Sequence, residues 1–201
     1  MCLDFESVYE TSSKHGTLVA RDRALALVRE AVGCLPVEGE FWECGVYRGG
    51  SARLLAEVIK PVPRTLRLFD TFYGLPAPSS FDTHREGEFK ASMWDVASFL
   101  QPYDFIHLHP GVIPRSFEGL EDTRIAFCHL DLDLYRSTRD ALAFVWPRLR
   151  RGGAIVIDDY EWEGSNGCPG VKRAVDESGL TVRQTADFQC VIWKKHLNGH
   201  N

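Results

Sequence analysis

Residues 124–160 read RIAFCHLDLDLYRSTRDALAFVWPRLRRGGAIVIDDY, and this stretch decides the fold class. It begins with an apolar run at 124–130 and ends with a second apolar run at 154–157, and each run is followed by two aspartates. The segment between them has helical spacing and can be capped by Ser137 or Thr138. A fully apolar strand is typical of a parallel sheet that is covered on both faces. The stretch therefore predicts a strand, a crossover helix and a second parallel strand.

The same alternation extends in both directions along the chain. The pattern predicts further helices at 17–33, 51–59, 86–100 and 171–178, and further strands at 41–44, 65–69, 103–108, 180–185 and 190–194. The last two strands are expected to form an antiparallel hairpin. Strands that alternate with helices favour an α/β fold with a doubly wound, mostly parallel sheet. We expect one domain over residues 1–201, with an N-terminal helix or lid region at 1–35 and the core at 36–201.

The composition argues against nucleic-acid-binding, membrane-bound and zinc-binding proteins. The chain has 201 residues, 44% of them hydrophobic, and a formal net charge of −5, which argues against a nucleic-acid partner because phosphate binding needs a basic surface. No apolar run approaches 18 residues, so no membrane partner is expected. The six cysteines include no C-x-x-C pair, which argues against a zinc site and favours reduced thiols in the cytoplasm.

A glycine-rich turn at residues 43–50, ECGVYRGG, separates the first expected strand from the next helix. Glycines allow the backbone of such a turn to approach a ligand closely. The spacing differs from the dinucleotide pattern G-x-G-x-x-G, because no second glycine follows Gly45 two residues later. S-adenosylmethionine therefore fits better than NAD, and Asp70, 25 residues after Gly45, is placed to hold a ribose. The alternatives are an ordinary turn between strand and helix and a solvated acid at a strand end.

Four carboxylates follow the two strands of the opening stretch. In an extended segment two residues that are two apart share a face, and the carboxyl ends of neighbouring parallel strands meet at one edge. Like charges gathered there repel one another unless a cation neutralises them, so a hard divalent ion such as Mg²⁺ or Mn²⁺ is the economical explanation. The four residues are Asp131, Asp133, Asp158 and Asp159. The alternative is that some of them cap helices or pair with Arg136 or Arg139.

The histidines carry a weaker signal. His129 lies inside an apolar strand, and we interpret it as a core or supporting group. His84, His107 and His109 lie near loops at the same edge of the sheet, and one of them is a candidate proton acceptor or substrate contact.

Several stretches together resemble one known family. GEFWECGVYRGGSARLLAEV at 39–58, FDTFYGLP at 69–76, and the opening stretch followed by GCPGVKRAVDE at 167–177 are similar to the macrocin O-methyltransferase (TylF-like) family. Members are metal-dependent enzymes that methylate sugar hydroxyls on macrolide, aminocoumarin and related natural products. The resemblance extends from Thr17 to Lys194 and implies a class I, Rossmann-like methyltransferase that uses S-adenosylmethionine.

The resemblance also implies roles for individual residues. Asp131, Asp158 and Asp159 match the Mg²⁺ ligands, and Asp133 matches the residue proposed as general base. Asp70 and Thr71 match the ribose-binding position, where the family usually has Asp-Ser. The full set of residues expected at the cofactor is Glu43, Gly45, Tyr47, Gly49, Ser51, Asp70, Thr71 and Gly111.

The acceptor is expected to be a hydroxylated small molecule, in the first place a sugar of a natural product. Two alternatives stay open. One is a cation-dependent O-methyltransferase of another vicinal diol, such as a catechol or a polyol. The other is a non-catalytic partner protein that binds S-adenosylmethionine. A homo-oligomer is compatible with the sequence.

Overall fold

The computed structural model describes residues 4–160 and 167–195. Its sheet has the strand order β3-β2-β1-β4-β5-β7-β6. β1 to β5 are parallel, and β7 is antiparallel to both β5 and β6. The strands are β1 (Glu40–Cys44), β2 (Leu66–Asp70), β3 (Ile106–Pro110), β4 (Ile125–Leu130), β5 (Leu149–Asp158), β6 (Arg183–Ala186) and β7 (Gln189–Trp193). The α/β class, the mostly parallel sheet and the C-terminal antiparallel hairpin are confirmed.

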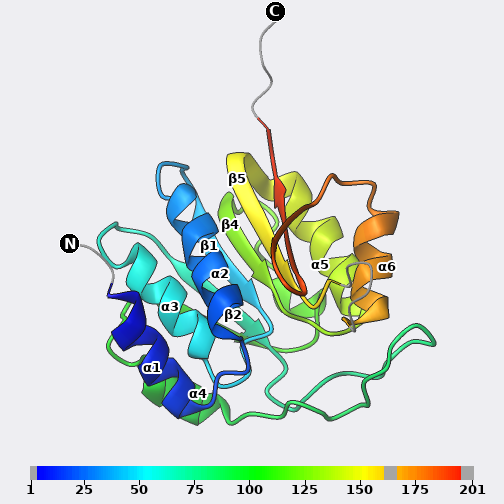
Figure 1. The fold of residues 1–201 in the computed structure, drawn as a ribbon, viewed down its shortest axis with the longest axis horizontal. Helices are drawn as coiled ribbons and strands as arrows, with labels where there is room; N and C mark the ends of the chain where they lie inside the picture. Colours follow the sequence, from blue (N-terminus) through cyan, green and yellow to red (C-terminus); the bar gives the residue numbers. More distant parts are fainter. Residues whose placement is uncertain (1–3, 161–166, 196–201) are drawn as a thin grey trace, which may run out of the picture.

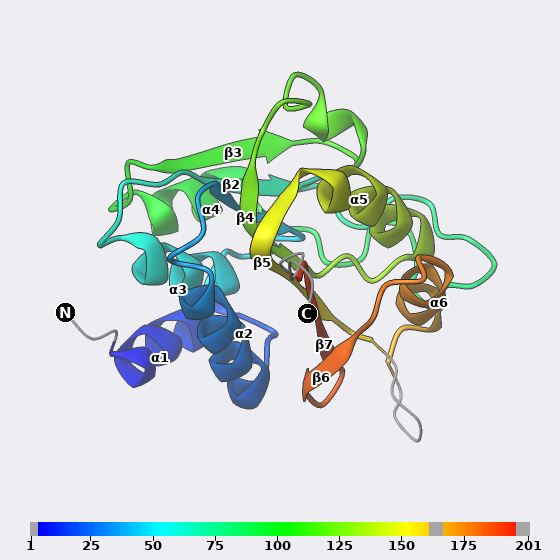
Figure 2. The ribbon, with the colours of Figure 1, turned by 90° about the horizontal axis from the view of Figure 1, so that it is seen from above.

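Helices cover both faces of this sheet (Figures 1 and 2). One face carries α1, α2 and α3, and the opposite face carries α5 and α6. The helices are α1 (Phe5–His15), α2 (Arg21–Gly33), α3 (Gly50–Ile59), α4 (Met93–Leu100), α5 (Tyr135–Arg148) and α6 (Pro169–Glu177), with a 3₁₀ turn at Arg115–Phe117.

Neighbouring strand residues supply two separate cores, because successive side chains of a strand point to opposite faces. Phe41 packs with the helices of the α2 and α3 side, whereas Trp42 packs with those of the α5 and α6 side. Both side chains are fully buried. The central strands are therefore apolar on both faces, as a doubly covered parallel sheet requires.

The register brings three strand ends together. Cys44 of β1 pairs with Leu130 of β4, and Leu130 pairs with Ile157 of β5. Gly45 and Asp131 follow these positions and leave the sheet side by side, next to Asp158 at the last position of β5. The backbone N–H of Asp131 also donates to the carbonyl of Cys44 at 2.8 Å. Ladder hydrogen bonds thus fix the distance between the glycine turn and the carboxylates.

Several predicted boundaries are wrong. The expected helix at 17–33 begins only at Arg21, as α2, and a separate helix that was not predicted, α1, precedes it and is ended by Gly16 in a left-handed conformation. The expected helix at 86–100 begins at Met93, where the Ser92 side chain accepts a hydrogen bond from the N–H of Asp95. α5 begins at Tyr135, so Ser137 and Thr138 lie inside its first turn, and Leu134 is the N-cap.

A cluster of polar side chains connects the neighbouring strands β1, β2 and β3. The Arg67 guanidinium donates to both carboxylate oxygens of Glu40, at 2.6 and 2.8 Å, and lies 3.2 Å from Nε2 of His109. Burial, Arg67 and His107 lower the pKa of His109, and Glu40 opposes them. His109 therefore has a structural environment that favours the neutral ring.

Within the described ranges no helix is both long enough and apolar enough to cross a membrane. The five cysteines in these ranges are free and buried. Cys2 lies outside the described residues.

Candidate active site

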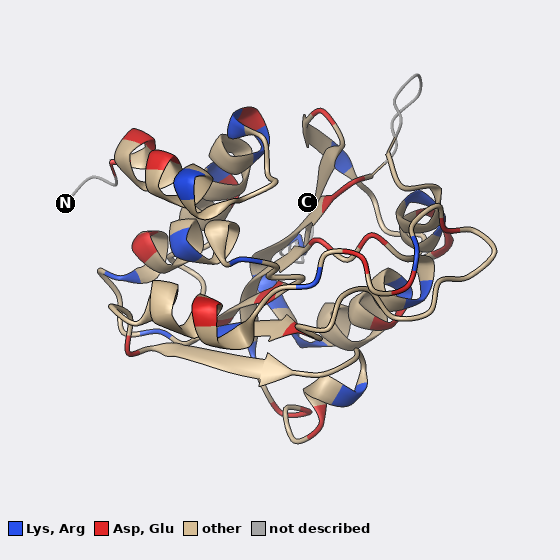
Figure 3. Cartoon of the chain, turned by 90° about the horizontal axis from the view of Figure 1, so that it is seen from below, with Lys and Arg blue, Asp and Glu red and all other residues tan. Residues whose placement is uncertain are grey.

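A cavity of about 400 Å³ opens where the parallel strands end. Figure 3 views the molecule from this side and shows acidic segments near the centre, with basic segments beside them. Most residues predicted for the site line this one cavity, although they come from five different connections of the sheet. They are Gly45, Tyr47, Ser51, Asp70, Thr71, Gly111, Asp131, Asp133 and Asp159.

Position 45 requires a glycine, because the backbone of Asp131 passes very close to it. Its φ is +87°, and a Cβ at this position would lie 1.7 Å from the carbonyl oxygen of Asp131. Asp70 holds the same turn, because one of its carboxylate oxygens accepts hydrogen bonds from the N–H groups of Val46 and Tyr47 at 2.7 and 2.9 Å. Its other oxygen accepts from the N–H of Phe72 at 2.8 Å. Asp70 therefore shapes the turn as well as lining the cavity.

Two residues predicted to contact the cofactor lie behind the cavity wall. Glu43 is fully buried, and its carboxylate lies 2.9 Å from Nδ1 of His129. Gly49 caps α3 with a φ of +83°, and a side chain there would face Val96 and Leu100 rather than the cavity. In the structure these two residues support the site from within the fold.

The aspartates that follow β4 and β5 meet as the sequence predicted. Asp131, Asp133 and Asp159 each place one carboxylate oxygen within 4.8 Å of the others, and Asp158 lies within the same distance of Asp131 and His129. Oδ2 of Asp158 is buried and accepts no hydrogen bond from the described residues, although Nη1 of Arg23 and Nε2 of His129 lie 3.5 and 3.7 Å from it. A buried carboxylate oxygen without a close donor is costly, and a divalent ion would satisfy it. The residues therefore fit a hard cation.

Asp133 reaches this cluster by a different backbone route from the one expected. The prediction of an extended segment at 131–133 is wrong, because Asp133 has a φ of +59°. The N–H of Leu134 closes a tight turn onto the carbonyl of Leu132 at 2.6 Å, and Leu134 is buried. The turn nevertheless directs the carboxylate of Asp133 into the cavity.

Burial and mutual repulsion shift the ionisation of these acids. Burial, followed by the charges of Asp158 and Asp159, raises the pKa of Asp131 well above its ordinary value. Burial and Asp159 raise the pKa of Asp133 to about 7. Burial also opposes the ionisation of Asp158, but His129 and Arg23 outweigh it and lower the pKa of that group.

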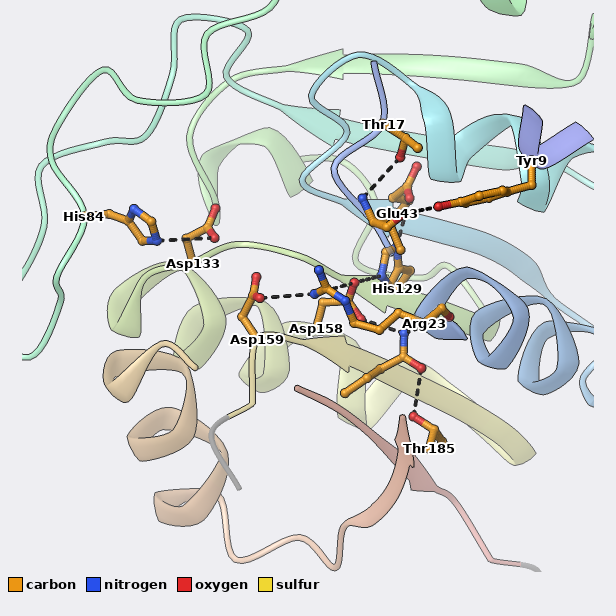
Figure 4. Close-up of polar contacts among 12 residues, drawn as sticks. Tyr9, Thr17, Arg23, Glu43, His84, His129, Asp133, Asp158, Asp159 and Thr185 are labelled. Atoms are coloured by element: carbon orange, nitrogen blue, oxygen red, sulfur yellow. Dashed lines mark hydrogen bonds and ion pairs between the residues drawn. The ribbon is translucent and has the colours of Figure 1, made fainter. Parts of the chain in front are cut away.

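Arg23 is the site residue that the sequence analysis missed. It extends from α2 to the carboxylates, with Nη1 at 3.2 Å from Oδ1 of Asp159 and 3.5 Å from Oδ2 of Asp158 (Figure 4). Gln189 of β7 supports this contact, because its amide donates to Oδ1 of Asp158 at 2.6 Å and to the carbonyl of Arg23 at 3.2 Å. The helix α2 thus supplies a cation to the acidic cluster.

His84 is the rim histidine that reaches the aspartates. Its Nε2 lies 3.9 Å from Oδ1 of Asp133 (Figure 4), and its Nδ1 lies 2.8 Å from Oε2 of Glu88. Asp133 forms no ion pair with the arginines of α5 in the described part of the chain, where Arg139 pairs with Asp140 instead.

The segment that carries His84, residues 71–92, crosses the strand ends between β2 and α4 (Figure 1). It is anchored to the far side of the sheet, because Asp82 accepts a hydrogen bond from the N–H of Tyr135 at 2.7 Å. The guanidinium of Arg173 in α6 also lies 3.8 Å from the ring centre of Phe81. This segment therefore forms one wall of the cavity.

A doubly wound sheet with this strand order, a glycine turn after β1 and acids after β2, β4 and β5 together define a class I methyltransferase. The family model described as macrocin-O-methyltransferase (TylF) matches residues 13–195. The chain belongs to this family and is an O-methyltransferase.

Curated relatives agree with this membership. The chain is 30% identical over 177 residues to the Streptomyces olivaceus 8-demethyl-8-(2,3-dimethoxy-alpha-L-rhamnosyl)-tetracenomycin-C 4'-O-methyltransferase, a match that covers 75% of this chain and 67% of the relative. It is 30% identical over 157 residues to the demethyldecarbamoylnovobiocin O-methyltransferase of Streptomyces niveus, covering 70% of this chain and 58% of that relative. The chain thus spans less than two thirds of the second relative.

Solved structures share the fold. The O-methyltransferase NovP superposes with a TM-score of 0.76 at 24% identity, covering 90% of this chain and 82% of that one. An SAH-bound methyltransferase from Podospora anserina superposes with a TM-score of 0.64 at 14% identity, covering 97% of this chain and 89% of the other.

Proposed function

We propose that the chain transfers a methyl group from S-adenosylmethionine to a hydroxyl of a natural-product sugar and that it requires a divalent cation, in the first place Mg²⁺. One observation carries this proposal. The carboxylates of Asp131, Asp133 and Asp159, which would repel one another, line one cavity with the glycine turn of a methyltransferase fold, and the buried Oδ2 of Asp158 accepts no hydrogen bond from the described residues.

The cofactor would lie along the first two strand ends. Gly45 and Tyr47 of the glycine turn line the cavity where the cofactor would lie, and Thr71 and Gly111 line the adjacent wall. Asp70 keeps the turn in shape through its bonds to two backbone N–H groups and is proposed to accept from the ribose hydroxyls. The solved relative that contains S-adenosylhomocysteine shares this fold.

The cation would lie at the next two strand ends. Asp131, Asp158 and Asp159 are proposed as its ligands, because Asp131 converges with Asp158 in one group of donors and with Asp159 in another, and oxygen ligands suit Mg²⁺ or Mn²⁺. When bound, S-adenosylmethionine supplies an electrophilic methyl group, and the cation lowers the pKa of a coordinated hydroxyl.

Asp133 is proposed to accept the proton of the acceptor hydroxyl at its carboxylate. It lies beside the other aspartates and lines the cavity, so it can contact a hydroxyl held at the same edge. A positioned base of this kind contributes roughly 10²–10⁴-fold to a rate. The segment at 71–92 would help to exclude water, because it covers one side of the cavity.

The acceptor class is proposed from the relatives. Two curated relatives are named for methyl transfer to a rhamnosyl-tetracenomycin and to a novobiocin precursor. Sugars carry vicinal hydroxyls, and a pair of them can occupy two neighbouring positions on one cation. A catechol and a polyol share this property and are the informative competitors.

The test measures methyl transfer from labelled S-adenosylmethionine to a deoxyhexose glycoside, a catechol and a polyol, each with Mg²⁺ or with a chelator. We expect the glycoside to be preferred and the chelator to abolish turnover. Asp133→Asn should lower kcat by about 10²–10⁴-fold. Asp140→Asn, an acid on α5 outside the cavity, is the matched control and should keep full activity. Full turnover of Asp158→Asn in the presence of chelator would contradict the proposal, and a preference for catechol would correct the acceptor class.

A further inference from the structure

Three side chains of different chemistry converge at the cavity, and Asp133 is one of them. They are His84 from the segment after β2, Asp133 from the turn after β4, and Cys168, which caps α6. One donor atom of each lies within 4.8 Å of the other two. We propose that this trio forms a second cation subsite, which takes a thiophilic divalent ion such as Zn²⁺.

His84 is already oriented as a metal-binding histidine would be. Its Nδ1 lies 2.8 Å from the carboxylate of Glu88, which leaves Nε2 facing Asp133 at 3.9 Å. Histidines that bind metals commonly place a carboxylate on the second ring nitrogen, which fixes the ring and makes it a better ligand. This contact is independent of the convergence of the three donors.

The main chain fixes Cys168 at the cavity. Its N–H donates to the carbonyl of Asp159 at 2.9 Å, and the helix that begins at Pro169 follows directly. Cys168 lines the cavity, although it belongs to the same apolar cluster as Cys44 and Cys128, which are fully buried strand residues and do not line it. The side chain of Cys168 is therefore the described thiol that an ion entering the cavity can reach.

The donors lie near the separations that a bound ion would impose. Tetrahedral Zn²⁺ with typical bond lengths separates its nitrogen, oxygen and sulfur ligands by about 3.3–3.6 Å. The separation of 3.9 Å between His84 and Asp133 is close to this range. The donor atom of Cys168 lies within 4.8 Å of the other two, so binding would draw the three donors closer together.

The ligand chemistry separates this subsite from the all-oxygen cluster. Thiolate and imidazole ligands select Zn²⁺ and similar ions, whereas carboxylates select Mg²⁺ and Mn²⁺. The absence of a C-x-x-C motif does not exclude zinc here, because the fold assembles donors that lie far apart in the sequence. One consequence rests on the proposed function. An ion in this subsite would occupy the carboxylate of Asp133 and would inhibit methyl transfer at saturating Mg²⁺.

The test uses Co²⁺ as an optical probe of the whole chain, with Mg²⁺ in excess and no cofactor or acceptor present. A Cys2→Ser background removes the one cysteine outside the described residues. We expect a thiolate-to-Co²⁺ charge-transfer band that Zn²⁺ abolishes. Cys168→Ser should lose the band. Glu88→Gln should weaken Co²⁺ binding by about 10–100-fold, which is the typical effect of removing a carboxylate behind a metal-binding histidine. His84→Gln should weaken it at least as much.

Cys190→Ser is the matched control, because Cys190 is a buried thiol on β7 that is not part of the trio. It should retain both the band and the affinity. The absence of a band in the unsubstituted trio, or its persistence in Cys168→Ser, would overturn the proposal. The Co²⁺ measurement needs no methyl transfer. A negative result would therefore overturn the second cation subsite without affecting the proposed function, and a failed methyl-transfer assay would not affect the subsite.

Discussion

Arg23 offers the sharpest test of how the acidic cluster is stabilised. Its side chain is only 17% exposed, and it lies within 3.5 Å of carboxylate oxygens of both Asp158 and Asp159. The substitution Arg23→Met keeps most of the length of the side chain and removes its charge. It leaves the aspartates without the cation that α2 supplies.

The expected magnitude follows from these distances. At 3.2–3.5 Å and an effective dielectric constant of about 20, each pair attracts by roughly 5 kcal/mol before desolvation is subtracted. Removal of one partner from a buried ion pair costs about 3–5 kcal/mol, because the remaining charge is left uncompensated. We therefore expect Arg23→Met to lower the free energy of unfolding by about 3–5 kcal/mol in the absence of divalent cations.

Urea unfolding with and without Mg²⁺ measures this effect. A cation at Asp131, Asp158 and Asp159 would neutralise the same charges as Arg23, so the loss should shrink at saturating Mg²⁺. Equivalently, Mg²⁺ should stabilise the variant more than it stabilises the unsubstituted chain. Arg139→Met removes an exposed pairing to Asp140 and should behave like the parent under both conditions. The reasoning is refuted if Arg23→Met costs the same with and without Mg²⁺, or if it costs no more than the control.

Three further predictions concern the residues around the cavity. Gly45→Ala should lower the free energy of unfolding, measured in urea, by several kcal/mol more than Gly119→Ala. Both glycines have a φ above +80°, but only at Gly45 would the added Cβ meet a backbone atom. Equal losses for the two variants would contradict the close approach. Glu43 positions His129, whose Nε2 lies 3.7 Å from Oδ2 of the proposed ligand Asp158. Glu43→Gln should therefore weaken binding of Mn²⁺, measured by electron paramagnetic resonance, by about 10–100-fold, and an unchanged affinity would show that the pair is only structural. The stability of the chain should fall as pH is lowered from 7 through the depressed pKa of His109, because the unfolded state binds the proton more readily. In His109→Gln the free energy of unfolding should depend less on pH between pH 5 and 7. If the dependence is unchanged, groups other than His109 cause it.

The sequence predicted the sheet because the deciding signals are local. The apolar run at 154–157, the glycine turn at 43–50 and the acids that follow them are each visible within a few residues, and the carboxyl ends of parallel strands must share one edge. The meeting of Asp131 with Asp159 therefore followed from topology alone. The resemblance to a known family added the chemistry of the site.

The missed features depend on contacts between distant parts of the chain. Arg23 and Asp159 are 136 residues apart, and nothing in the helical pattern around Arg23 distinguishes it from an exposed arginine. The family resemblance implies that Glu43 contacts the cofactor, but its partner His129 faces it from the neighbouring strand β4. The turn at Asp133 depends on burial of Leu134, which becomes visible only when α5 is packed.

The close approach of Gly45 to the carbonyl of Asp131 has a consequence for redesign of this enzyme. The turn proposed to hold the methyl donor and the strand end proposed to hold the cation form one rigid backbone unit, with no side chain between them to retune their spacing. Variation for new acceptors is therefore best confined to the part of the segment at 71–92 that follows Thr71, which lies across the cavity and is anchored by side-chain contacts at Phe81 and Asp82. Libraries built there would leave the geometry of the transfer unchanged while altering which molecules can enter.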